Sequence, residues 1–306
     1  PSPPAPTATS PAPAPALKVT PPEAGQLAKQ AERKLKEKEP AAALALYQRA
    51  WDAGAREADV AYSAACAAVL ANQRDEAFRW LDLALGAGFR DADWMKKDED
   101  LVPLQADARF AKAVEQAIAN GAREDAAIQQ PRLAKEILAM AERDQQVRFK
   151  LLRNGPNMDP TVVEEMKAVD LEHTARMKEI IATHGWPGTR LVGRTASKRA
   201  WLLVQHADLN VEFQELCLAA LEKAVAAGDA DPKEWAYLHD RVQVNRKRPQ
   251  RFGTQFYPVN GVQVPRPMED PEHVDERRRS IGLGTMEEYA RELSEMSRMP
   301  ASPKQP

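Results

Sequence analysis

Polar side chains with acid–base potential end the most apolar segment of the chain, AWLLVQHADLN at residues 200–210. Four apolar residues, 201–204, run directly into Gln205, His206 and Asp208. An imidazole titrates near neutral pH and a neighbouring carboxylate can orient it, so His206 and Asp208 are the candidate catalytic pair if the protein is an enzyme. Burying such groups without partners is costly, so the segment either closes a helix end or lines a pocket.

Other polar groups along the chain could complete a site around this pair. Guanidinium groups can bind a phosphate or carboxylate in a bidentate manner, and amides can orient a polar ligand. The candidate ligand-binding residues are Gln205, Asp240, Arg241, Gln255, Arg278, Asp144 and Arg148. The competing interpretation is a buried ionic network in which Asp240 and Asp275 pair with three arginines, Arg241, Arg277 and Arg278.

The chain shows no established catalytic motif. Ser197 and Thr254 lack the surroundings of a nucleophile elbow, and the histidines lack zincin spacing. No glycine-rich loop that could cradle a phosphate is found, so we predict no metal and no cofactor. We therefore favour binding of a small polar or anionic ligand over an acid–base or hydrolytic enzyme. A purely structural interaction protein, in which the polar groups satisfy one another, is the remaining alternative.

A repeat with a period of 34 residues runs through the amino-terminal half of the chain. The small–large–small pattern of Ala43, Tyr47 and Ala50 recurs at positions 77, 81 and 84, as in the second helix of a tetratricopeptide repeat. The segments AYSAACAAVLANQRDEAFRWLDLALGAGF and KKDEDLVPLQADARF, within residues 58–118, resemble the end-of-group variety of this repeat. The resemblance implies a helical module over residues 23–120 that docks a protein partner. Packing against the following domain alone is the structural alternative.

Helix-start and helix-stop signals divide the carboxy-terminal half into helices. Pro131 opens the first helix, and Gly185 ends the second. The predicted caps are Thr195 or Ser197 for a third helix ending near Ala207, Asn210 for a fourth, Asp231 for a fifth and Thr285 for the last, at 286–298. Asn260-Gly261 predicts a β-hairpin near 252–264. The predicted fold class is mainly α: a short tetratricopeptide-type helical array, then a helical domain at 131–298 with one β-hairpin.

Short polar motifs follow one another in a distinctive order along this half. They are DQQVR (144–148), VD (169–170), GWPGTRLVG (185–193), WLLVQHAD (201–208), FQ (213–214), LHDRV (238–242), PQRFGTQF (249–256), VDERR (274–278) and GL (282–283). In these motifs, residues 131–296 resemble an uncharacterised bacterial domain of unknown function (family 6624). The resemblance supplies no reaction. Residues 246–248 form a basic triplet where relatives often have a glycine-containing turn, and we interpret the triplet as solvated.

Composition restricts the class of protein. The chain has 306 residues, 29% of them charged, with a net charge of −2, which argues against a general nucleic-acid binder. No apolar run approaches the length of a membrane span. Residues 1–22 form a Pro/Ala-rich tract, predicted to be a disordered spacer, and residues 299–306 a disordered tail. Such a tract is typical of exported, periplasmic proteins, free or lipid-anchored, with an arbitrary chain start as the alternative. Cys66 and Cys217 are predicted to be free buried thiols.

Overall fold

A computed structural model describes residues 21–153, 159–259 and 262–298. The fold is mainly α, with one antiparallel hairpin of two strands, as the sequence predicts. Residues 1–20, 299–306 and 260–261 lie outside the described residues, and with them most of the predicted spacer, the predicted tail and the predicted Asn260-Gly261 turn. None of the described helices is both long and apolar enough to cross a membrane.

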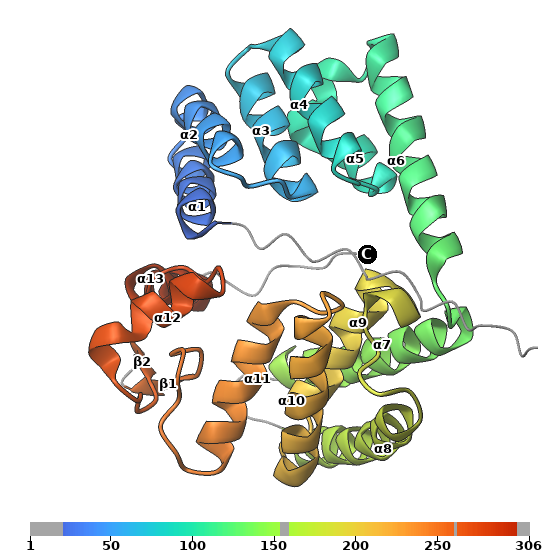
Figure 1. The fold of residues 1–306 in the computed structure, drawn as a ribbon, viewed down its shortest axis with the longest axis vertical. Helices are drawn as coiled ribbons and strands as arrows, with labels where there is room; N and C mark the ends of the chain where they lie inside the picture. The colour runs from blue at the N-terminus through green and yellow to red at the C-terminus, as the bar shows by residue number, and fades with distance from the viewer. Residues whose placement is uncertain (1–20, 154–158, 260–261, 299–306) are drawn as a thin grey trace, which may run out of the picture.

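Six α-helices and one 3-10 helix form the amino-terminal half (Figure 1). They are α1 (Pro22–Lys36), α2 (Pro40–Asp52), α3 (Ala58–Leu70), α4 (Arg74–Gly86), α5 (Ala92–Lys97), η1 (Glu99–Leu104) and α6 (Ala108–Ala127). Helix α1 packs on α2 and α3 on α4, so the helices form pairs. Helices α2 and α4 begin 34 positions apart. All six residues of the small–large–small pattern are buried, which makes the array compatible with the predicted repeat.

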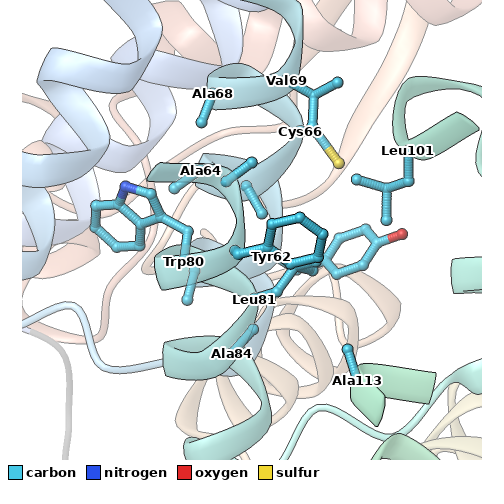
Figure 2. Packing of buried hydrophobic residues seen from close by; sticks show 14 of the residues in the cluster. Tyr62, Ala64, Cys66, Ala68, Val69, Trp80, Leu81, Ala84, Leu101 and Ala113 are labelled. Carbon is cyan, nitrogen blue, oxygen red and sulfur yellow. The ribbon is translucent and has the colours of Figure 1, made fainter. Parts of the chain in front are cut away.

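The core of this half combines small residues with large aromatic rings. Figure 2 shows alanines of α3 beside Trp80 and Leu81 of α4, both of which are fully buried. The Trp80 ring meets Trp51 edge to face, with 5.7 Å between the ring centroids. The alanines of α3 fill little space, so α2 and α4 can pack closely against α3. Phe110 of α6 belongs to the same core, so α6 closes the stack as the sequence predicts.

The carboxy-terminal half has a core of its own. Its elements are α7 (Pro131–Arg153), α8 (Pro160–His184), α9 (Thr189–Gln205), α10 (Val211–Ala226), α11 (Pro232–Asn245), β1 (Phe256–Val259), β2 (Val262–Pro265), η2 (Pro271–His273), α12 (Val274–Ser280) and α13 (Met286–Arg298). Helix α7 packs on both α8 and α9, and α10 packs on α11. The strands pair antiparallel, with Phe256 opposite Pro265 and Val259 opposite Val262.

Most of the predicted helix caps are confirmed. The Asn210 side chain accepts a hydrogen bond from the Phe213 N–H, and the Asp231 side chain accepts one from Lys233. Thr285 and Glu288 form the predicted capping box, in which each side chain bonds the backbone N–H of the other residue.

A short helical segment that starts at Thr189 was not predicted, but the helix that follows the non-helical Gly193 begins close to the predicted caps, Thr195 or Ser197. Asp229, distant in sequence, supplies the cap. Its carbonyl accepts the Thr189 N–H and its carboxylate accepts the Arg190 N–H. Gly193, with φ of 79°, then interrupts the helix near its start.

The two halves touch at several places. The backbone N–H groups of Gln129 and Gln130, between α6 and α7, donate to carbonyls at the start of α9. The Nζ atom of Lys29 on α1 lies 3.8 Å from Oε1 of Glu292 on α13. Cys66 and Cys217 are both free and buried, as predicted.

Candidate functional site

The carboxylate that faces His206 belongs to Asp144 of α7. The Nδ1 atom of His206, which caps the end of α9, lies 2.9 Å from both Asp144 carboxylate oxygens. Because a carboxylate can only accept, Nδ1 carries a proton, and in the neutral form of the ring Nε2 is left as an acceptor. The Asp144 side chain is 1% exposed and that of His206 is 18% exposed. Among the described residues, Nε2 has no hydrogen-bond partner, so it is available to a ligand.

Arg148 ties this pair to α8. Its Nε donates to Asp144 Oδ1 at 3.0 Å, and its Nη2 donates to Asp170 Oδ1 at 2.6 Å. Burial alone would raise the pKa of Asp144, but the hydrogen bond and charge of His206 outweigh it and hold this pKa below its ordinary value. At Asp170 burial prevails and raises the pKa despite the charge of Arg148. We call Asp144, Arg148, Asp170 and His206 the His206 cluster.

Two buried polar atoms close to the His206 cluster in the chain lack partners within the described structure. They are Nδ1 of His173 on α8 and Nε2 of Gln205, the residue before His206. Burial lowers the pKa of His173, and Asp144 is the carboxylate that counteracts this effect most. Buried polar groups normally have hydrogen-bond partners, so these two atoms could form hydrogen bonds with a ligand or a water molecule.

Asp208, the predicted partner of His206, instead contacts α11. Its carboxylate accepts from Nε and Nη2 of Arg241, at 2.8 and 2.5 Å, and from the Asn245 side chain at 2.8 Å. The Gln214 amide also donates to Asp208, at 3.2 Å. The sequence-based pairing misses this arrangement because α9 ends at Gln205, so Asp208 leaves the face that the helix would have given it.

Asp240 and Arg278 both act on the loop before the hairpin. The Asp240 side chain is fully buried and accepts from the N–H groups of residues 251, 252 and 254 and from the Thr254 hydroxyl. Arg278 donates to the Phe252 and Gly284 carbonyls. The Gln255 side chain donates to Thr254 Oγ1. The predicted ionic network is therefore wrong within the described structure, because no arginine pairs with Asp240 or Asp275. Arg241 pairs with Asp208, Arg277 pairs with Asp270, and Arg278 donates to backbone carbonyls.

The predicted site residues thus fall into three groups, centred on His206, on the Asp208–Arg241 pair and on the Asp240 loop. Two clefts lie elsewhere on the described structure. One, of about 610 Å³, lies between α4 and α6, and the other, of about 520 Å³, lies between α8 and α10 beside Trp186. No predicted site residue lines either of these clefts.

Sequence reasoning missed two residues with unusual electrostatics. Asp170 joins the His206 cluster from α8, and its only signal in the sequence was the VD motif at 169–170. Glu234, in the first turn of α11, has its pKa raised to about 7 by burial and by the charge of Asp231. A helix-start pattern gives no hint of this, because the acid looks like an ordinary first-turn glutamate.

One group of possible metal ligands lies in the amino-terminal half. The donor atoms of Cys66, Asp98 and Asp100 lie within 4.8 Å of one another. Hydrogen bonds explain this grouping, since Asp98 accepts from the Tyr62 hydroxyl at 2.7 Å and from the Asp100 N–H at 3.0 Å. Asp98 therefore caps the start of η1.

Comparison with known proteins identifies a family for this chain but does not indicate a reaction. A family model described as "Family of unknown function (DUF6624)" matches residues 131–299. No curated protein and no solved structure matches the chain.

Proposed function

Because the chain belongs to this family of unknown function, we propose its function from its own residues. The carboxy-terminal half binds a small polar ligand through His206, and the amino-terminal half is a tetratricopeptide-type array that docks a protein partner. The Pro/Ala-rich tract at residues 1–22 supports an exported, envelope location, free or lipid-anchored. The repeat assignment rests on the paired helices and the buried small–large–small pattern.

The Asp144–His206 pair is the observation that carries the ligand proposal. A buried carboxylate fixes the ring, and Nε2 is left without a partner among the described residues. Such an acceptor suits a ligand that presents a hydroxyl or an amine. The arginines that would bind an anion are already engaged, Arg148 by two carboxylates and Arg241 by Asp208. These contacts favour a polar ligand over an anionic one.

His206→Ala tests this proposal, with His184→Ala as the matched control. His184 is exposed at the end of α8. We would screen small polyols, amino acids and carboxylates by ligand-observed NMR and measure unfolding in urea. We expect wild type and His184→Ala to bind the same compounds, and His206→Ala to lose them while losing less than about 2 kcal/mol of stability. A wild-type protein that binds none of the panel, with a strongly destabilised His206→Ala, would instead support a purely structural role.

Acid–base or hydrolytic catalysis is the second candidate, and the fixed tautomer of His206 favours it. A neutral imidazole whose Nδ1–H points at a carboxylate presents Nε2 as a general base. Chromogenic esters, phosphoesters and glycosides would reveal such activity. His206→Gln should reduce any rate by at least about a hundredfold, because general-base catalysis contributes about that much. Turnover that survives His206→Gln unchanged would exclude His206 as the base.

A further inference from the structure

The cleft between α4 and α6 has a positively charged wall. Arg109, Lys112, Gln116 and Arg123 line it from α6, and Asp82 is the acidic residue that lines it from α4. Asp107 and Asp75 already hold Arg109, which also lies over the Phe78 ring. Lys112 and Arg123 have no ion-pair partner among the described residues. These two cations therefore give the cleft its open positive charge.

The basic wall is a continuous stripe along one face of α6. Residues 109, 112, 116, 120 and 123 follow the three- and four-residue spacing that keeps side chains on one side of a helix. The buried Asn120 anchors this face to α4, because its side-chain amide donates to the Leu85 and Phe89 carbonyls at 2.9 and 2.8 Å. The stripe is thus built on packed helices rather than on a loop.

The spacing of the cations sets the shape of a complementary partner. Lys112 and Arg123 are 11 residues apart, which corresponds to about 16 Å along a helix axis. An extended peptide advances about 3.3 Å per residue, so carboxylates about five residues apart would meet both cations. A single small anion could not bridge that distance.

We infer that the cleft between α4 and α6 binds an extended acidic segment of a protein partner, through Lys112 and Arg123. This inference rests on the proposed docking function of the amino-terminal half and names the chemistry of its partner. Acidic residues about five apart engage the two cations, and the backbone between them lies along Gln116. Asp82 opposes acidic side chains on the α4 side, so the peptide lies toward α6.

The test uses the full chain and a fluorescein-labelled six-residue probe with glutamates at both ends and serines between, so that the two carboxylates are five positions apart. Lys112→Glu/Arg123→Glu removes the open cations. Arg49→Glu/Lys97→Glu is the matched control, because it makes the same charge change at exposed positions of the same half. We expect the wild type to bind the probe, more weakly at higher salt, and the cleft variant to bind at least about tenfold more weakly. The control variant should bind within about twofold of wild type.

No binding by the wild type, or an equal loss in both variants, would overturn the inference. Circular dichroism checks that both variants fold, and Lys112→Gln/Arg123→Gln, which adds no repulsion, should also weaken binding. Photo-crosslinking from exposed positions of α2 addresses the proposed docking function separately. A protein captured there, with no probe bound, would leave docking intact and reject the acidic-segment inference. If the probe binds at the cleft but no protein is captured, the acidic-segment inference stands and the proposed docking through α2 is rejected.

Discussion

Asp240 and Arg278 hold the same short loop from its two hydrogen-bonding sides. Asp240 accepts the N–H groups of Phe252 and Thr254, and Arg278 donates to the Phe252 carbonyl at 2.6 Å. Asp240 is 0% exposed and Arg278 is 1% exposed. Each buried charge is therefore stabilised by hydrogen bonds to the peptide groups of the loop, and the opposite charge lies on the other side of these groups. This clamp joins α11, the loop and α12 into one unit.

Asp240→Asn should therefore be strongly destabilising. An amide oxygen cannot accept from as many donors as a carboxylate, and its NH2 group would face N–H groups that also donate. We expect a loss of about 2–4 kcal/mol in the free energy of unfolding, measured in urea. Amide hydrogen exchange at residues 251–254 should accelerate. Glu222→Gln, at an exposed position of α10, is the control and should change little.

Gly253 should resist substitution for two reasons. Its φ is +63°, which disfavours any residue with a Cβ, and an added Cβ would lie 2.3 Å from Met286 Sδ. Gly185 has a similar φ of +72° with nothing within 4 Å of an added Cβ, so Gly185→Ala isolates the backbone cost. We expect Gly185→Ala to cost about 1 kcal/mol and Gly253→Ala about 1 kcal/mol more in urea unfolding. Equal costs would mean that the methionine moves aside freely.

Arg148 should be more important to stability than Arg143 on the same helix. Arg148 compensates the buried Asp144 and Asp170, whereas Arg143 pairs with exposed Glu172. Arg148→Met would leave two carboxylates in the interior without their cation, and we expect it to cost about 3–5 kcal/mol at neutral pH. Arg143→Met should cost less than about 1 kcal/mol. Similar costs in urea unfolding would contradict this assignment.

The same Arg148→Met variant should recover part of its stability in acid. The pKa of Asp170 is already raised by burial, and losing Arg148 removes the charge that opposes this rise. A raised folded-state pKa favours the protonated folded form, so the penalty falls as pH drops toward that pKa. Unfolding at about pH 5 should therefore show a smaller difference from wild type than at about pH 7. A pH-independent difference would count against this explanation.

Replacing Glu234 with a neutral residue should raise the free energy of unfolding above neutral pH. Its folded-state pKa of about 7 exceeds the ordinary value of 4.5, so it favours folding below about pH 4.5 and loses this contribution as pH rises through about 7. Glu234→Gln should thus raise the free energy of unfolding at about pH 8, by at most about 3 kcal/mol, with little effect at about pH 5. Melting temperature across this range, with Glu222→Gln as control, checks the sign. A destabilised Glu234→Gln at about pH 8 would show that the carboxylate has an unrecognised partner.

The sequence alone determined the features that depend on neighbours within a few residues. The Asn210 and Asp231 caps and the Thr285–Glu288 box join groups at most three positions apart, so local residue types suffice to specify them. The buried pattern at positions 43, 47 and 50 follows equally from helical periodicity. The position of the hairpin was predictable for the same reason.

Only the tertiary structure decided which polar groups meet. His206 is oriented by Asp144, 62 positions away, and Asp208 pairs with Arg241, 33 positions away. Asp229 caps the start of α9 from 39 positions beyond Arg190, which is why no local pattern predicted the short helical segment before Gly193. Such pairings depend on how helices rotate and cross when their apolar faces pack, and no local pattern encodes that geometry. Adjacency in the chain suggested His206 with Asp208, but the end of α9 at Gln205 turns these two side chains toward different helices.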